Sequence, residues 1–445
     1  MRKKHILQRS IFEFYCEHES GQQLKSISAK LDEHPKILDL ASEALISPVT
    51  KSTGRCGLSV DSIVRAALLK QMMGLTYNDL SFYLADSHSY RSFARVESEP
   101  SSSSLQSCVS KLDENTWEKI NRLLLADASQ AGIEKGRMVR IDSTVTETNI
   151  HPPTDSSLLW DCVRIMVSQL TRVKGMLKPG YFDFCNPCRA AKKRARNITY
   201  ARGANKTKLY KELLQYTKQT KAYLALAISL TKHVQDEMVF SILQLEAENL
   251  IRLTDKVICQ TERRVLQGEK VPHEEKVFSI FETHTDIIIK GARDIQYGHK
   301  LNLTTGKSGL VLDVFIEQGN PADTARLCPM IDRQQEIYGR VPRQVAVDGG
   351  YASTDNLKKV KAMGVKDAAF HKKRGLKIED MVKSDWVYKK LRNFRAGVEG
   401  NISCLKRRYG LSRCTWRGLE KFKAYIWSST VAYNLMLLAR LEPIG

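Results

Sequence analysis

Apolar residues recur at alternating intervals of three and four along much of the chain, which is the spacing of amphipathic helices. Helical spacing covers residues 1–136 and is clearest at 60–73, where Gly74 fits a C-terminal cap and Thr76 opens a further helix to Leu84. Two helices joined by a glycine-centred turn have the outline of a DNA-reading helix-turn-helix unit, but many ordinary helical hairpins share it. Other helices are expected at residues 6–16, 35–44, 105–112 and 116–131, with a polar linker at 100–104.

A change of pattern at residue 137 marks the start of β-rich sequence. Residues 137–145 favour a strand, and Asp142 lies inside this apolar run, where a carboxylate is costly to bury unless it binds a cation. Residues 156–270 show no strand signal and alternate amphipathic helices with basic clusters, so they are interpreted as a helical insertion within a larger domain. Further strands are expected at residues 277–281, 287–290, 299–304, 310–316, 344–348 and 366–370, and further helices at 320–338, 354–363 and 418–441.

One of the later strands ends on an acid, Asp348, which two glycines follow. Loops at the carboxyl ends of strands are the usual ligand sites of α/β sheets, so Asp348 is a candidate site residue. Asp323 precedes this strand, but it is interpreted as a first-turn acid that stabilises its own helix.

A third candidate acid, Glu399, lies in an amphipathic helix expected at residues 387–409. Glu399 borders the apolar stripe of this helix, and three cations share its face, namely Arg392, Arg395 and Lys406. Two glycines flank Glu399 and would let another backbone or a substrate come close. The alternative is a solvated ion-pair face, because structural charge networks are common.

The three acids together indicate a metal site. Without the insertion, the order of elements brings the first strand, a later strand and a late helix into one α/β domain. If Asp142, Asp348 and Glu399 converge at one edge of its sheet, they suit two Mg²⁺ ions, because hard cations prefer oxygen ligands. Two such ions can stabilise both the attacking and the leaving oxygen in a phosphodiester displacement.

The composition adds an electrostatic argument. The 445 residues include 70 Lys and Arg against 49 Asp and Glu, a formal net charge of +21. This surplus favours a polyanionic partner such as DNA, although ribosomal and membrane-surface proteins share it. One basic cluster of the insertion, with Lys192, Lys193 and Arg194, is either a solvated helix face or a contact to the DNA backbone. No apolar run of about 18 residues predicts a membrane helix, and no apolar signal core follows the basic amino terminus.

Ten cysteines are scattered along the chain, and only Cys185 and Cys188 have the spacing of metal ligands. No second pair or nearby histidine completes a tetrahedral zinc site, so a zinc or redox role is not expected. Reduced thiols are the default for a cytoplasmic protein.

Five short stretches carry further information, at residues 140–150, 297–300, 319–323, 347–351 and 395–400. In these motifs the chain resembles the DDE-type bacterial insertion-sequence transposases, in the broad insertion sequence 4/5-like group. The signature of that family is Tyr, Arg, Glu and Lys, and its intervals are kept here by Arg395, Glu399 and Lys406. Arg392 occupies the tyrosine position, which questions the role of the tyrosine and not the acids.

The resemblance implies an α/β fold with a ribonuclease-H-like catalytic core. It implies that Asp142, Asp348 and Glu399 are the catalytic, metal-binding DDE triad; two rival first acids, Glu147 and Asp155, match the motif less well. The implied domains are a helical N-terminal DNA-binding domain at residues 1–136, the catalytic domain at 137–409 with its helical insertion at about 156–270, and a C-terminal helix packing on the core at 410–445.

The activity that the resemblance implies is DNA transposition. The protein is expected to bind the terminal inverted repeats of its element, cut the ends with activated water and join the freed 3′-hydroxyl to target DNA. Two Mg²⁺ ions, or Mn²⁺ in their place, are the expected cofactors, and the DNA contacts are expected from Arg392, Arg395, Lys406, Lys192, Lys193 and Arg194. A homodimer on paired DNA ends, no membrane partner and a location at the bacterial nucleoid in the cytoplasm complete the expectation.

Two other functions stay open from the sequence. One is a DNA-binding regulator with an inactive core, against which the presence of all three acids counts. The other is a ribonuclease-H-like nuclease without strand transfer, which would use the same metal chemistry.

Overall fold

The structure is a computed structural model that describes residues 4, 14–46, 57–231, 237–290, 294–372 and 374–441. The chain divides into two compact units, one of Met1–Asn149 and Ile288–Gly445 and the other of Ile150–Ile287. The second unit contains the residues of the predicted insertion, 156–270. The helix predicted at residues 6–16 lies largely outside the described residues.

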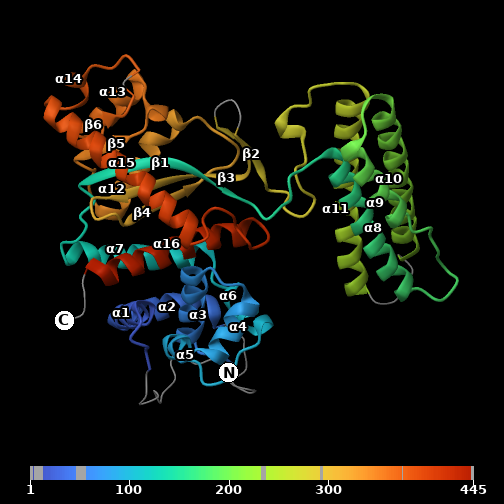
Figure 1. Cartoon of the computed structure of the whole chain (residues 1–445), viewed down its shortest axis with the longest axis horizontal. Helices are drawn as coiled ribbons and strands as arrows, with labels where there is room; N and C mark the ends of the chain where they lie inside the picture. Colours follow the sequence, from blue (N-terminus) through green and yellow to red (C-terminus); the bar gives the residue numbers. More distant parts are fainter. Residues whose placement is uncertain are drawn as a thin grey trace. The chain divides into compact units, whose positions relative to one another are not determined.

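The first unit is built on a six-stranded sheet with the order β2-β3-β1-β5-β6, and β4 also pairs with β3 (Figure 1). β1 runs antiparallel to β3 and parallel to β5, and β5 runs parallel to β6. This mixed sheet confirms the predicted α/β class. The strands are β1 Met138–Glu147, β2 Asp286–Lys290, β3 Asp294–Gly306, β4 Val311–Ile316, β5 Gln344–Val347 and β6 Asp367–Phe370.

Two of the strand predictions need correction. β3 is much longer than residues 299–304, because it pairs with β1 along one edge and with β4 along the other. Residues 277–281 form no strand. The side-chain amide of Gln260 accepts a hydrogen bond from the Val277 N–H at 2.8 Å and donates one to the Val277 carbonyl at 3.3 Å. Those backbone groups are therefore satisfied without a neighbouring strand.

Helices fill the part of the first unit that precedes β1. They are α1 Glu19–Glu33, α2 Lys36–Leu45, α3 Val60–Met73, α4 Tyr77–Asp86, α5 His88–Ala94, α6 Ser102–Val109 and α7 Glu114–Gln130. The predicted α3–α4 hairpin is confirmed: Gly74 caps α3 in the left-handed conformation with a φ of 63°, and Thr76 caps α4. The predicted linker at residues 100–104 is wrong, because the Ser101 hydroxyl accepts from the Ser104 N–H and starts α6.

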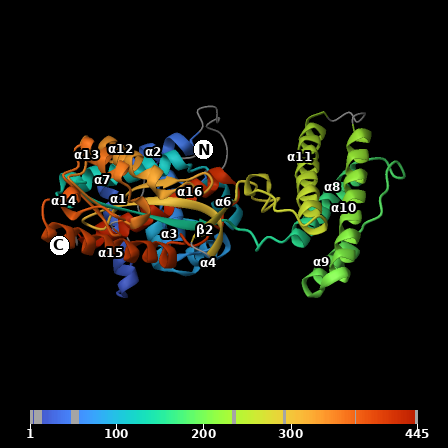
Figure 2. The same ribbon diagram turned by 90° about the horizontal axis from the view of Figure 1, so that it is seen from above.

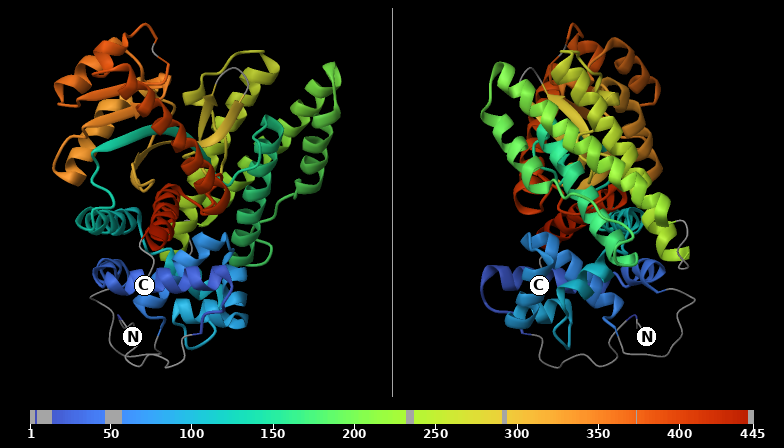
Figure 3. Two further views of the ribbon diagram at one scale, coloured as in Figure 1. Left: turned by 60° about the vertical axis from the view of Figure 1, so that its left-hand side comes forward. Right: turned by 90° about the vertical axis from the view of Figure 1, so that its right-hand side faces the viewer.

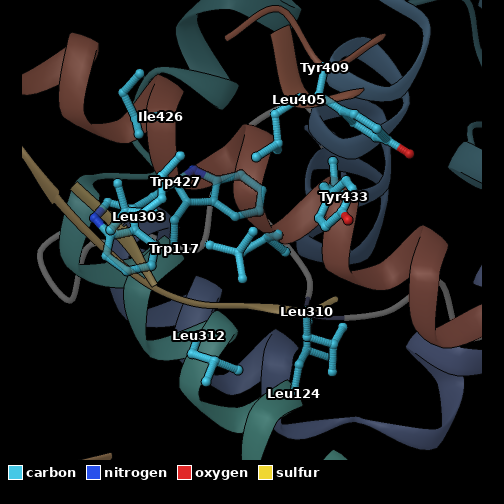
Figure 4. Packing of buried hydrophobic residues seen from close by; sticks show 14 of the residues in the cluster. Trp117, Leu124, Leu303, Leu310, Leu312, Leu405, Tyr409, Ile426, Trp427 and Tyr433 are labelled. Atoms are coloured by element: carbon cyan, nitrogen blue, oxygen red, sulfur yellow. The ribbon is translucent and has the colours of Figure 1, made fainter. Parts of the chain in front are cut away.

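The carboxyl-terminal helix α16 (Leu419–Leu441) joins these helices to the sheet. It packs on α7, α3 and α1 and is buried on nearly all sides, as an apolar helix in the centre of a domain is. Asn434 of α16 accepts from the Val311 N–H at 2.9 Å and donates to the Val311 carbonyl at 2.8 Å, which ties α16 to β4. Figure 4 shows Trp427 and Trp117 among the side chains of this core. Whether residues 1–136 act as a domain of their own stays a prediction.

The remainder of the first unit alternates helices and strands. Its helices are α12 Leu327–Tyr338, α13 Thr354–Ala362, α14 Ile378–Met381 and α15 Asp385–Arg408. The helix predicted from residue 320 begins later, because a short 3₁₀ turn at Asp323–Arg326 precedes α12. The longest of the four, α15, packs across β1, β5 and β6 and so lies against the part of the sheet that carries Asp142 and Asp348.

The second unit is a bundle of helices (Figures 2 and 3). Its long helices are α8 Asp155–Met176, α9 Cys188–Tyr200, α10 Gly203–Thr231 and α11 Glu237–Thr261. Their buried side chains, such as Leu159, Leu213 and Val257, form a hydrophobic core separate from that of the first unit. Among the described residues, no helix of either unit is both long enough and apolar enough to span a membrane.

Candidate active site

The register of two neighbouring strands places Asp142 and Asp348 side by side. Ile141 of β1 pairs with Val347 of β5 in the parallel ladder, and each aspartate is the next residue in its chain segment. Adjacent strands lie about 4.8 Å apart, so two carboxylates at the same level can share one ligand. Register of this kind is invisible in the sequence, because residues 141 and 347 belong to distant segments.

Arg395 joins the three predicted acids. Its Nη2 lies 2.9 Å from Asp142 Oδ2 and 3.5 Å from Asp348 Oδ1. Its Nη1 lies 2.9 Å from Glu399 Oε1, one helical turn further along α15. The structure therefore brings the three acids together around a single guanidinium.

The members of this acidic cluster differ in their access to solvent. The side chains of Arg395 and Asp142 are 11% and 13% exposed, whereas that of Glu399 is 69% exposed. The cluster thus has a buried side on the sheet and an open side on α15. Its carboxylates outnumber the guanidinium that they share, so a further cation would be attracted from the open side.

The donor set suits a divalent cation. Carboxylate oxygens are the ligands that Mg²⁺ and Mn²⁺ prefer, and a cationic group already lies among these three. In the part of the chain that the structure describes, no three His, Cys, Asp or Glu side chains are gathered closely enough to hold a metal ion directly. The Arg395 guanidinium lies among the carboxylates, where a shared metal ion would otherwise lie.

Arg140 fixes α15 to the sheet beside the acids. Its guanidinium donates to the Phe394 carbonyl at 2.7 Å and to Asn401 Oδ1 at 2.6 Å. Gly397 makes room for it, because a Cβ there would lie 2.2 Å from Arg140 Nη1. The sequence predicted space for a backbone or a substrate at the flanking glycines, but at Gly397 a side chain of the protein fills that space. At Gly400 the space is open.

A buried polar network lies behind the Asp348 loop. The Tyr351 hydroxyl donates to Asn302 Oδ1 at 2.8 Å, and Asn302 Nδ2 donates to Glu317 Oε1 at 2.7 Å. Glu317 in turn pairs with Arg326, whose Nη2 lies 2.6 Å from Oε2. Burial, together with the acids nearby, raises the pKa of Tyr351 well above its ordinary value, so its hydroxyl keeps the proton that it donates. The sequence does not reveal this network, since its members come from four separate segments.

A second buried pair supports the same loop. The Lys300 ammonium lies 2.6 Å from Asp323 Oδ1, and its side chain is 7% exposed. A Cβ on Gly350 would lie 2.7 Å from Asp323 Oδ2, so the pair lies directly against the residues that follow Asp348. Asp323 is therefore more than a first-turn acid. The signal available in the sequence was that both residues belong to motifs of the transposase resemblance.

The cations predicted to contact DNA from α15 have different surroundings. Arg392 is exposed and makes no ion pair among the described residues. Lys406 is half-buried, and burial lowers its pKa while Glu147 opposes that change. Arg395 is engaged by the acids. Contacts between these three cations and DNA stay predictions.

The members of the basic cluster in the second unit also differ in their surroundings. Lys192 and Lys193 are exposed on α9, while Arg194 Nε donates to Glu212 of α10 at 2.9 Å. Arg194 thus helps to hold two helices of the bundle together, and the two lysines are free to meet a partner.

Three other residues considered in the sequence have structural surroundings. Cys185 and Cys188 are free thiols, without a cluster of further metal ligands in the described residues. Asp155 lies in the second unit, where Arg264 Nη1 is 3.1 Å from its Oδ2. The cluster around Arg395 therefore contains Asp142 and not this rival acid.

Comparison with known families gives one match. Residues 281–435 match the family model described as Transposase DDE domain. The matched segment includes Asp348, Arg395 and Glu399, and it begins after Asp142. Searches among curated proteins and among solved structures found no match. Residues 281–435 are thus similar to a transposase DDE domain, and this similarity supports a transposase function.

Proposed function

We propose that the protein is a DDE transposase of the insertion sequence 4/5-like group, which cuts DNA at the terminal inverted repeats of its element and joins the freed 3′ ends to target DNA. The observation that carries this proposal is the ion-pair cluster in which Arg395 binds Asp142, Asp348 and Glu399. These acids come from β1, from the end of β5 and from α15. The domain match over residues 281–435 supports the same chemistry.

The order of the strands supports a ribonuclease-H-like core. Strands β4, β3 and β1 form an antiparallel series, and β5 and β6 continue from β1 in parallel. Asp142 lies in β1, and Asp348 directly follows β5, the strand beside β1. Along the sequence, the large helical unit lies between β1 and the remaining strands. The strands on either side of it still pair in one sheet.

In this proposal Asp142, Asp348 and Glu399 hold two Mg²⁺ ions, for which Mn²⁺ can substitute. Bound there, the ions would stabilise the attacking and the leaving oxygens of the phosphodiester displacement. Arg395 is a positioning residue that keeps the carboxylates together until metal is bound. Tyr351 and Lys300 hold the Asp348 loop from behind.

The DNA is proposed to lie along the open side of α15. Exposed Arg392 and half-buried Lys406 lie before and after Glu399 on this helix and would bind phosphates on either side of the cleaved bond. Two copies of the chain would pair the two ends of the element, in the bacterial cytoplasm where the DNA is. The net charge of +21 supports binding to duplex DNA.

The test is an assay with a precut DNA end that carries a free 3′-hydroxyl, together with a target plasmid. We expect Asp142→Asn, Asp348→Asn and Glu399→Gln each to lower both cleavage and joining by at least about 10²-fold, the loss typical of removing one preorganised electrostatic group. Binding to the ends should persist in all three variants. Glu147→Gln tests the rival first acid on the same strand as Asp142, and we expect this variant to keep the wild-type rate.

Each outcome separates the possible functions. A wild-type rate in any one of the acid variants removes that residue from the triad. If the wild-type protein binds ends but neither cuts nor joins, it is a regulator with an inactive core. If it cuts in Mg²⁺ but never joins a 3′-hydroxyl to the plasmid, it is a nuclease without strand transfer.

A further inference from the structure

A cleft of about 620 Å³ lies within the first unit, away from the acidic cluster. One side is the turn between α3 and α4, and the other is the segment 409–417, which directly follows α15. Figure 1 shows α3, α4 and α6 as neighbours in the unit. The volume is that of an ordinary ligand site.

The charged residues that line this cleft are all positive. They are Lys70, Arg413, Arg417 and Lys421, and the lining contains no Asp or Glu. A second cleft in the same unit, of about 490 Å³, has three cations and three glutamates in its lining. The positive charge of that second cleft is compensated inside the protein, whereas no carboxylate of the lining compensates the first.

Lys70 is the buried member of the four cations. Its residue is 4% exposed, and within the described residues its ammonium makes no hydrogen bond or ion pair. The ammonium lies 4.9 Å from the centre of the Tyr77 ring and 5.8 Å from that of Trp416. Burial lowers the pKa of Lys70 to about 8. A largely buried ammonium without a carboxylate partner costs stability, and an anion bound in the cleft would offset that cost.

We propose that this cleft binds a phosphate group of the DNA on which the protein acts, with Lys70 at its centre. The inference rests on the proposed function, which supplies the polyanion. Arg417 and Lys421 are exposed, so the positive charge extends from the cleft to the surface. A DNA strand, whose phosphates continue beyond the cleft, needs this extension, whereas a small free anion does not. Tyr77 is partly exposed, so its ring is available to the adjoining sugar or base.

The cleft lies between two elements that a bound DNA phosphate would connect. The α3–α4 hairpin has the outline of a helix-turn-helix unit, and the segment 409–417 is continuous with the helix that carries Glu399. A phosphate bound between them would touch both at once. DNA recognised through the hairpin would then be held at a fixed distance from the acidic cluster, because all of these elements belong to one compact unit.

The test compares two variants of the full-length protein, Lys70→Met and Lys359→Met. Both lose one positive charge, but Lys359 is an exposed residue of α13 that pairs with Asp355 outside the cleft. We expect Lys70→Met to bind an end-containing DNA duplex about tenfold or more weakly than Lys359→Met, since hydrogen bonds to charged groups contribute that much. Its salt slope should fall by about one, the value for one lost phosphate contact.

Thermal unfolding without DNA shows whether a loss of DNA binding in Lys70→Met comes from a loss of folding. Lys70→Met should unfold at the wild-type temperature or above it, because it removes an uncompensated buried charge and keeps the volume of the side chain. Equal affinities and equal slopes for the two variants would overturn the proposal. The proposal would also be overturned if the cleft bound only a free anion. In that case inorganic phosphate raises the unfolding temperature of the wild type but not of Lys70→Met, while Lys70→Met and Lys359→Met bind DNA equally.

The two proposals fail in different ways. If the wild type cuts and joins DNA and Lys70→Met binds like its control, the cleft proposal alone is wrong. If Lys70→Met loses affinity and the wild type never cuts DNA, the phosphate site stands and the transposase chemistry is wrong.

Discussion

Arg395 is the counter-ion of the acidic cluster. As a counter-ion it allows three carboxylates to lie close together on a partly buried surface, where they would otherwise repel one another. In the proposed function, the same carboxylates would bind metal once this guanidinium moves away. The sequence indicated that Arg395 lies near Glu399 on the helix, but it could not indicate that the guanidinium reaches across to two strands.

The counter-ion function can be tested without measuring catalysis. Arg395→Ala should lower the free energy of unfolding by about 1–3 kcal/mol in the absence of metal, the cost of leaving charged groups unsatisfied. Millimolar Mg²⁺ should raise the unfolding temperature of Arg395→Ala more than that of the wild type, because the ion no longer competes with a guanidinium. Arg392→Ala is the control, since Arg392 binds none of the acids and should leave the Mg²⁺ effect unchanged. If Mg²⁺ raised the unfolding temperatures of Arg395→Ala and the wild type equally, Arg395 would not compete with the ion for the acids.

At the scale of elements, hydrophobic spacing predicted those whose burial follows a simple period. The helices α3, α4, α15 and α16 and the strands around Asp142 and Asp348 are present with small differences in their ends. The stripe of α15 was predicted as purely apolar, yet its buried residues include Arg395 and Asn401. Those polar side chains are buried because distant partners satisfy them, and no local pattern contains this information. The helices α1, α5 and α14 were not among the predicted ranges, although α1 and α5 lie within residues 1–136, for which helical spacing was predicted.

The two glycines of α15 make a matched pair of tests for how that helix is held. Gly397→Ala should lower the free energy of unfolding by about 1–3 kcal/mol, because the new Cβ would lie 2.2 Å from Arg140 Nη1 and disturb its buried hydrogen bonds. Gly400→Ala should raise it by up to about 1 kcal/mol, since open space surrounds this position and alanine is the better helix former. Urea denaturation of both variants measures the difference. Equal effects would mean that Arg140 does not anchor the helix.

At the scale of the whole molecule, the chain is two compact units with different charge arrangements. The first unit contains both the acidic cluster and the positive cleft, to which we assign the chemistry and a DNA contact in our proposals. The second unit has its own core and presents exposed lysines on α9. The sequence predicted that residues 156–270 are a helical insertion, but it left open whether their basic clusters bind DNA or are merely solvated.

Salt dependence of DNA binding distinguishes those two interpretations. For six to ten neutralised phosphates, the affinity of the wild type should fall about 10³–10⁵-fold between 50 and 200 mM salt. The double variant Lys192→Ala, Lys193→Ala should reduce the slope by about two if both exposed lysines contact phosphates. Arg194→Ala is the matched control within the same cluster, because Arg194 is engaged by Glu212 and its loss should lower the thermal stability and leave the slope unchanged. An unchanged slope in the double variant would assign the α9 cluster to a solvated face, and DNA contact would then rest on the first unit alone.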